Sequence, residues 1–327
     1  MPIKLAFLLL GFVFLGTIAA ETDVARTVAL LGEIGWGFLF ILAIYLVAFA
    51  IDSYAWQLSA PTVPQNLTWL YRFFQLRLVG EAFDTVTPTA GMGGEAVKAV
   101  MLKNHYGVDY RDGTASLVLA KTMIVVTLVA FLALGFSLML GSLKLDASYK
   151  VISGIGLASF AVGAGLFYIV QRYRVASMTG TILARSRWLH KLNDVLGHLR
   201  GVEDRLVDFY TRRPMRLLGV FVLSFTNWTL GVAEVWTVMQ LIGHPISFED
   251  AWIIESMAQL VRAATFFIPA NIGTQEGAFL IAAVAIAGQP SFGLAIALAR
   301  RIRELAWTIW GFTVFYTLQP RPSESSA

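Results

Sequence analysis

Charged side chains inside an apolar stretch near the C-terminus are the first candidates for chemistry. Four of them fall within the run from Phe292 to Leu318: Arg300, Arg301, Arg303 and Glu304. An ionised side chain near a bilayer centre costs about 2.5–3.5 kcal/mol on insertion scales, so each of these residues needs a partner. Arg300 and Glu304 have the i,i+4 spacing of an ion pair on one helix face. The other arginines require acids elsewhere, and three are candidates: Glu95, Glu255 and Glu276.

Two interpretations of these basic residues stay open. The arginines can hold a helical bundle together through buried pairs with the glutamates. Alternatively, surplus positive charge receives a phosphate, to which the arginine fork is well matched. Lys98, Lys121 and Arg262 would add to that charge. For Lys98 and Lys121, extension of the side chain to the membrane interface is a third interpretation.

Two proline- and glycine-containing motifs lie near these charges. The first is Pro88-Thr89-Ala90-Gly91-Met92-Gly93-Gly94-Glu95, and the second is Pro269-Ala270-Asn271-Ile272-Gly273-Thr274-Gln275-Glu276, followed by Gly277. Proline removes a backbone donor and glycine permits left-handed turns, so the motifs predict two interrupted helical segments, Trp69–Tyr106 and Ala251–Gln289. Irregular chain at membrane depth persists only inside protein or against a wet cavity. The alternative is a pair of interfacial turns with the glutamates as first-turn caps.

The motifs match in register. Each proline precedes its glutamate by seven positions, and each glutamate precedes a glycine, Gly107 or Gly288, by twelve. A basic residue follows inside the next span in both cases, Lys121 in one and Arg300-Arg301 in the other. A repeat of opposite topology with paired broken helices indicates a transporter's midplane binding site. The half-helices would then direct free N–H groups at an anionic head group.

The predicted substrate-binding residues are those of the motifs and the nearby charges: Pro88, Gly91, Gly93, Gly94, Glu95, Lys98, Lys121, Arg262, Pro269, Gly273, Glu276, Gly277, Arg300, Arg301, Arg303 and Glu304.

Composition sets the fold class. Of 327 residues, 57% are hydrophobic and 14% charged, whereas a soluble domain is about a quarter charged. The apolar residues fall in runs of about 20, the thickness of a bilayer core. We predict an all-α, polytopic membrane bundle over residues 1–327, with about six full spans besides the two broken segments. The expected spans are Ile3–Ala20, Gly35–Ile51, Ser116–Gly141, Val151–Val170, Leu217–Ile242 and Phe292–Leu318. The first of them has a cleaved signal peptide as its alternative.

One long polar segment, Gln171–Arg216, sets the orientation. It carries ten Lys/Arg residues against four acids, which by the positive-inside rule predicts a cytoplasmic location. Counting spans from it places the loop Lys144–Lys150 outside and both termini inside. Its helical apolar spacing fits an amphipathic helix on the leaflet or a helical hairpin that caps the bundle. We expect a multi-pass protein of the bacterial inner membrane.

Several kinds of chemistry are excluded by residue type. The chain has no cysteine, which excludes disulfides and thiolate metal sites, and its four histidines lack metal-ligand spacing. A formal net charge of +4 agrees with basic loops of a membrane protein better than with a nucleic-acid partner. No nucleotide-binding or Ser/His/Asp pattern occurs. We therefore expect no cofactor, no metal and no enzymatic activity.

The motifs of this sequence resemble those in the membrane region of lysylphosphatidylglycerol synthase/flippase proteins. Within that family, the chain is most similar to the group associated with hopanoid biosynthesis. The resemblance rests on Gly35-Trp36-Gly37, Asp52–Trp56, Gly80-Glu81-Ala82, the two motifs, and the stretch from Arg300-Arg301 to Gly311. It implies an all-helical bundle with re-entrant helices that binds or moves a lipid between leaflets. Because no aminoacyl-transferase domain follows Leu318 in this sequence, lipid lysylation is not expected.

Three functional hypotheses follow. The preferred one is a flippase-like transporter of an anionic or amphiphilic lipid: a phospholipid, a polyprenyl phosphate or a hopanoid-type lipid. The second is a non-transporting partner of lipid-biosynthesis enzymes that acts through Gln171–Arg216. The third is an intramembrane enzyme acting on a lipid phosphate, which the scarcity of acids disfavours.

Overall fold

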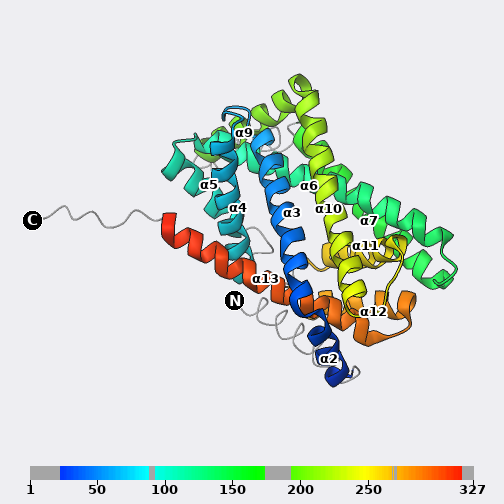
Figure 1. Ribbon diagram of the computed structural model, residues 1–327. Helices are drawn as coiled ribbons and strands as arrows, with labels where there is room; N and C mark the ends of the chain where they lie inside the picture. Colours follow the sequence, from blue (N-terminus) through cyan, green and yellow to red (C-terminus); the bar gives the residue numbers. More distant parts are fainter. Residues whose placement is uncertain (1–22, 88–92, 174–192, 267, 269–270, 319–327) are drawn as a thin grey trace, which may run out of the picture.

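The protein is a bundle of helices (Figure 1). The computed structural model describes residues 23–87, 93–173, 193–266, 268 and 271–318, and no strand occurs among them. The first half comprises α2 (Val24–Ile34), a 3-10 turn (Gly35–Gly37), α3 (Phe38–Ser59), α4 (Leu67–Val86), α5 (Gly93–Tyr106), α6 (Tyr110–Gly141) and α7 (Ala147–Arg172). The second comprises α9 (Asn193–Arg212), α10 (Pro214–Leu241), α11 (Phe248–Ala264), α12 (Thr274–Ala287) and α13 (Pro290–Leu318). The predicted all-α class is confirmed.

Four helical stretches in the described ranges are long and apolar enough to cross a membrane. They are Ala25–Ser59, Tyr110–Gly141, Ala147–Arg172 and Pro214–Leu241, and each contains or largely overlaps an expected span. The 29 residues of α13 also suffice for a span, but this helix carries the arginine cluster. The expected span Ile3–Ala20 lies outside the described residues. The chain is a multi-pass membrane protein.

Both predicted interruptions separate two helices. α4 ends at Val86 and α5 begins at Gly93, while α11 ends at Ala264 and α12 begins at Thr274. In the second break Asn271 and Gly273 have φ angles of 49° and 80°, which end the helical path. Pro88, Gly91 and Pro269 lie outside the described residues.

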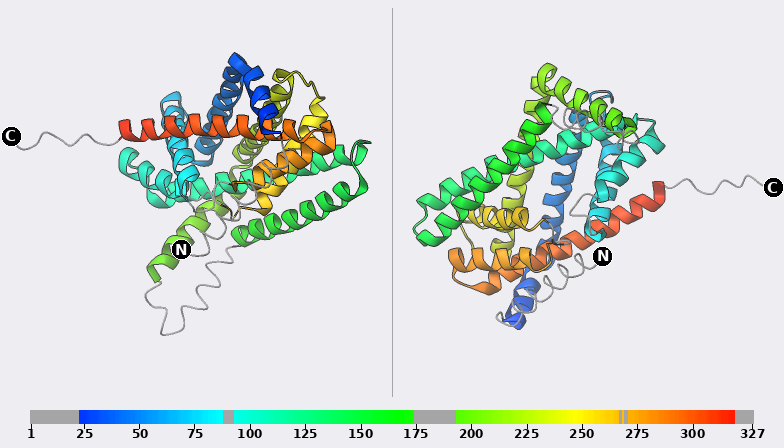
Figure 2. Two further views of the ribbon diagram at one scale, coloured as in Figure 1. Left: turned by 90° about the horizontal axis from the view of Figure 1, so that it is seen from below. Right: turned by 180° about the vertical axis from the view of Figure 1, so that it is seen from behind.

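The two halves pack as counterparts. At the centre α3 and α10 lie side by side and antiparallel (Figure 1): Gly37 at the start of α3 meets Leu241 at the end of α10, and Leu58 meets Gly219. The helix α4, which precedes the first break, packs against α13 (Figure 2), and its counterpart α11 packs against α6. Antiparallel counterparts with exchanged partners agree with an inverted repeat of the two broken segments and the spans that follow them, and the pairing of α3 with α10 extends that relation by one helix on each side.

The end of the basic segment packs on the bundle. Leu206 and Phe209 of α9 bury their side chains against Leu119 of α6, and the Tyr210 hydroxyl donates to Oε1 of Gln171 at 3.1 Å. Burial raises the pKa of the Tyr210 phenol to about 12. This packing agrees with the bundle-capping interpretation for residues from 201 onward, whereas residues 174–192 lie outside the described part of the chain.

Candidate functional site

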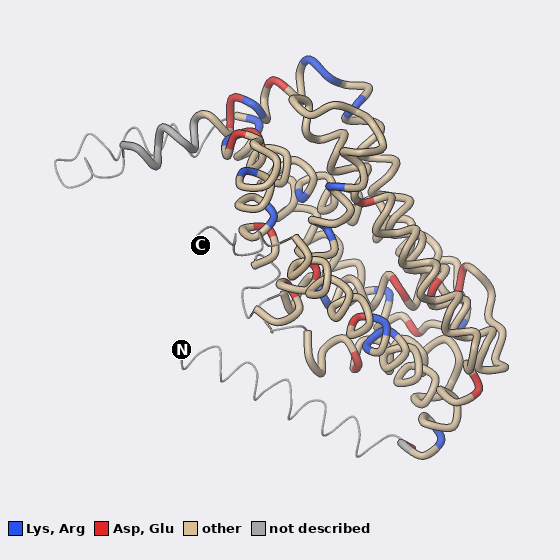
Figure 3. Tube along the Cα trace, turned by 60° about the vertical axis from the view of Figure 1, so that its left-hand side comes forward, with Lys and Arg blue, Asp and Glu red and all other residues tan. Residues whose placement is uncertain are grey.

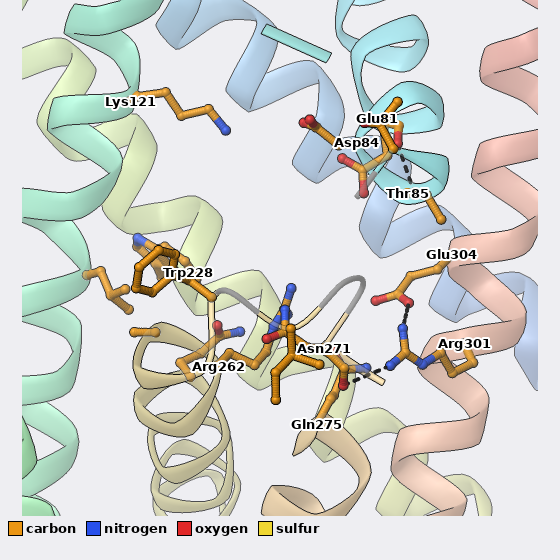
Figure 4. A pocket seen from close by; sticks show the side chains of 16 residues that line it. Glu81, Asp84, Thr85, Lys121, Trp228, Arg262, Asn271, Gln275, Arg301 and Glu304 are labelled. Carbon is orange, nitrogen blue, oxygen red and sulfur yellow. Dashed lines mark hydrogen bonds and ion pairs between the residues drawn. The ribbon is translucent and has the colours of Figure 1, made fainter. Parts of the chain in front are cut away.

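A polar hollow of about 340 Å³ lies between the two breaks. Its lining comes from α4, α6, α10, α11, α12 and α13, together with Thr87 before the first break and Asn271 within the second (Figure 4). A neighbouring cavity of about 260 Å³ shares Glu81, Lys121 and Arg262 with it. The tube view shows residues of both charge signs along the helices between the ends of the bundle as well as at those ends (Figure 3). Wet space inside the protein is what permits irregular backbone in a membrane.

Opposite walls of the hollow carry opposite charge. Lys121 of α6 and Arg262 of α11 lie across from Glu81 and Asp84 of α4 (Figure 4). Glu81 is paired with Arg77 at 2.7 Å, so Asp84 is the carboxylate of this wall without an ion pair among the described residues. Glu81 and Arg262 occupy equivalent places in the repeat, because each precedes the proline of its motif by seven residues. A head group that carries both charge signs could therefore bind in the hollow in one orientation, with its negative part toward Lys121 and Arg262.

The first half-helix is fixed to the bundle by charges. Oε1 of Glu95 lies 2.8 Å from Nζ of Lys98 and 2.9 Å from Nζ of Lys121. The Lys98 residue is 6% exposed and its Nζ lies 5.1 Å from the Trp56 ring centroid, so it does not extend to the interface. Lys121 has a side chain 47% exposed, and it lines the hollow.

The second half-helix repeats this arrangement. Oε1 of Glu276 lies 2.7 Å from Nε of Arg301, whose Nη1 lies 3.0 Å from Oε2 of Glu304. Arg301 also donates from Nη2 to the carbonyl of Asn271 at 3.3 Å. In both halves, the first-turn glutamate of the half-helix therefore pairs with a base of the span that follows.

Protein carboxylates already accept hydrogen bonds from the starts of both half-helices. The Gly94 N–H donates to Oδ1 of Asp84 at 2.8 Å, and the Gly273 N–H donates to Oε2 of Glu276 at 2.8 Å. The capping role considered for the glutamates is thus present at Glu276, the residue directly before the buried Gly277. The sequence predicted free N–H groups at the starts of both half-helices, available to an anionic head group. In the structure a protein carboxylate already binds at each of these helix starts. Gly93 and Gly94 start α5, and a side chain on Gly94 would overlap the carbonyl of Gly80.

Arg300 and Arg303 belong to a buried ion-pair network instead of the hollow. Arg300 donates to both carboxylate oxygens of Glu255 at 3.2 and 2.8 Å and lies 2.8 Å from Oε2 of Glu234. Nη1 of Arg303 lies 2.9 Å from Oε1 of Glu234, and all four residues are 1% exposed. The predicted pair of Arg300 with Glu304 is wrong, because Arg300 points to α10 and α11 while Glu304 pairs with Arg301.

The part of the chain that carries the hollow and the ion-pair network is similar to known proteins. The family model for the lysylphosphatidylglycerol synthase TM region matches residues 3–311. The chain belongs to this family. A UPF0104 membrane protein of Pyrococcus horikoshii is 22% identical over 290 residues, which cover 84% of each chain. Another, of Methanothermobacter thermautotrophicus, is 22% identical over 279 residues, 81% of this chain and 80% of the relative. No solved structure matches significantly.

Sequence reasoning had missed two features of this member of the lysylphosphatidylglycerol synthase TM region family. The first is Glu234, the acid that joins Arg300 to Arg303. Its position inside the apolar helix α10 was the available signal, since an ionisable residue within a span marks a site by default. The second is the acidic wall of Glu81 and Asp84, which the matching distance of Glu81 and Arg262 from their prolines could have indicated.

Proposed function

We propose that the chain translocates a lipid between leaflets, with a phosphate-bearing head group passing through the hollow while the apolar chains stay in the bilayer. The observation that carries this proposal is the hollow between the two breaks, with one basic and one acidic wall. The charged walls favour a phospholipid or a polyprenyl phosphate over a hopanoid-type lipid without a charged group. Membership of the lysylphosphatidylglycerol synthase TM region family supports a lipid-related role.

Arg262 is the residue that contacts the head group most directly in this proposal. Its side chain lines the hollow, is half-buried, and makes no hydrogen bond or ion pair with any residue in the described ranges. Lys121 lies in the same basic wall and is half-exposed toward the hollow, although Glu95 already binds its ammonium. A phosphate would give Arg262 a hydrogen-bonded partner, and charge-assisted bonds of this kind contribute about 1.5–3 kcal/mol.

Removal of the Arg262 charge is expected to slow lipid exchange about ten-fold or more, the rate equivalent of one such bond. The test uses proteoliposomes containing a fluorescent phosphatidylglycerol analogue, with dithionite quenching the outer-leaflet probe. Arg262→Gln should retain folded protein and lose exchange, while Arg26→Gln, an exposed arginine of α2, serves as the control. Normal exchange in Arg262→Gln would contradict the assignment of the site.

In this proposal the lipid is transported without being chemically changed. Mass spectrometry of the lipid recovered from the same proteoliposomes should return the starting mass, and a new lipid product would instead support catalysis. Co-purification of lipid-biosynthesis enzymes with the full chain would support the partner role, provided that Arg262→Gln left the cellular function intact.

The proposed orientation in the inner membrane is testable because the chain contains no cysteine. Leu143, in the α6–α7 loop, is fully exposed, and Pro64, between α3 and α4, is exposed. In intact cells, Leu143→Cys should react with a membrane-impermeant maleimide, and Pro64→Cys should react only after permeabilisation. The reverse pattern would contradict cytoplasmic termini and require the opposite orientation.

A further inference from the structure

A second cavity, of about 240 Å³, lies where α3 ends, α6 begins and α9 joins α10. It shares no lining residue with the hollow between the breaks. Leu119, Leu206 and Phe209 form its apolar wall, and Ser59, Thr62 and Arg213 are among its polar lining. Its volume is below the roughly 300–1,000 Å³ of sites that enclose drug-sized ligands, so it fits a head group or a small anion.

Among the charged residues around this cavity, one arginine has no carboxylate partner in the described part of the chain. Asp112 pairs with Arg205, and Oδ1 of Asp208 lies 3.0 Å from Nε of Arg212. The side chain of Arg213 lines the cavity, is half-buried, and has no hydrogen-bond or ion-pair partner within the described part of the chain. One turn further along α10, Nη1 of Arg216 is buried and likewise lacks a partner among the described residues. A half-buried guanidinium beside a cavity and without a carboxylate is suited to an anion.

We propose that this cavity binds a phosphate-class anion through Arg213, at a site separate from the translocation hollow. The ligand is either the head group of an anionic phospholipid or a soluble phosphate, which share the chemistry that Arg213 recognises. The apolar wall of Leu206 and Phe209 fits the carbon atoms next to the phosphate of a lipid head group. Because α9 caps the cavity, an occupied site would connect α9 to the start of α10.

The test measures binding of dioleoyl phosphatidic acid to the full chain in detergent by native mass spectrometry. All proteins carry Arg262→Gln, so that the hollow does not contribute. Arg213→Gln is expected to weaken binding about ten-fold, as the loss of one charge-assisted bond predicts, and Arg213→Lys should retain much of it. The control is Arg26→Gln, at an exposed arginine outside the cavity lining, and it should bind normally.

Two further arms complete the experiment. If inorganic phosphate competes with the lipid, the ligand is a soluble anion, and if it does not compete, the ligand is a lipid head group. Both results support the site if Arg213→Gln weakens the binding. Thr62→Trp, at an exposed lining residue, should narrow the cavity and weaken binding even if Arg213→Gln does not fold. Unchanged binding in Arg213→Gln, or equal weakening in Arg26→Gln, would overturn the proposal.

Discussion

Replacement of Arg300 by methionine is expected to destabilise the folded protein by about 3–5 kcal/mol, the usual cost of leaving a buried charge without its partner. Arg300 pairs with Glu255 and Glu234 on two other helices, and each of the three residues is 1% exposed. Without the guanidinium, Glu255 would retain only the amide of Gln259, which donates to Oε1 at 2.6 Å. The free energy of unfolding, measured by titration of mixed micelles with sodium dodecyl sulfate, tests this prediction.

A double variant separates lost charge balance from lost packing. Glu255→Gln combined with Arg300→Met removes one charge of each sign and should recover much of the stability lost in Arg300→Met. The exposed Arg26→Met should change stability by less than about 0.5 kcal/mol, as surface substitutions do. A cost below about 1 kcal/mol for Arg300→Met would contradict a role of the network in holding α10, α11 and α13 together.

Replacement of Arg301 by alanine is expected to reduce lipid exchange about a hundred-fold or more while the protein remains folded. Arg301 joins α13 to the second break through Glu276 and the carbonyl of Asn271, and it also neutralises Glu304 at the edge of the hollow. Its loss would release the start of α12 and leave two carboxylates facing an anionic head group. Each of these two effects is comparable to the removal of one charged hydrogen bond, which lowers a rate about ten-fold. Because the two reductions multiply, the expected loss is about a hundred-fold.

The charge component of this effect has its own control. Arg301→Ala combined with Glu304→Gln restores one unit of charge but not the contact with Glu276, so exchange should recover only in part. Arg301→Lys, which keeps the charge without the fork, should lie between Arg301→Ala and the natural chain. Full activity of Arg301→Ala would separate the second break from transport.

The breaks and the fold class were predictable because their causes are local. Proline and glycine act on the backbone at their own positions, and the run length of apolar residues reports the bilayer directly. The equal spacing of Glu95 and Glu276 from their prolines was also visible in the sequence, whereas the pairing of each glutamate with a base of the following span, Lys121 or Arg301, comes from the structure.

The partners of the arginines were not predictable in the same way, because they depend on which helices meet. The i,i+4 spacing of Arg300 and Glu304 indicated a pair, but tertiary contact with α10 and α11 directs Arg300 to Glu255 and Glu234 instead. The same packing divides the arginine cluster: Arg300 and Arg303 turn into the bundle, and Arg301 lines the hollow. Residue type alone did not distinguish structural arginines from candidate binding residues.

Electron cryomicroscopy of the full chain in nanodiscs of native lipid tests the central claim most directly. The proposed function predicts density for a lipid head group in the hollow between α4 and the second break, with its phosphate within hydrogen-bonding distance of Arg262 and its chains leading to the bilayer. A map in which side chains fill the hollow and ordered lipids contact only the outer surface of the bundle would contradict it.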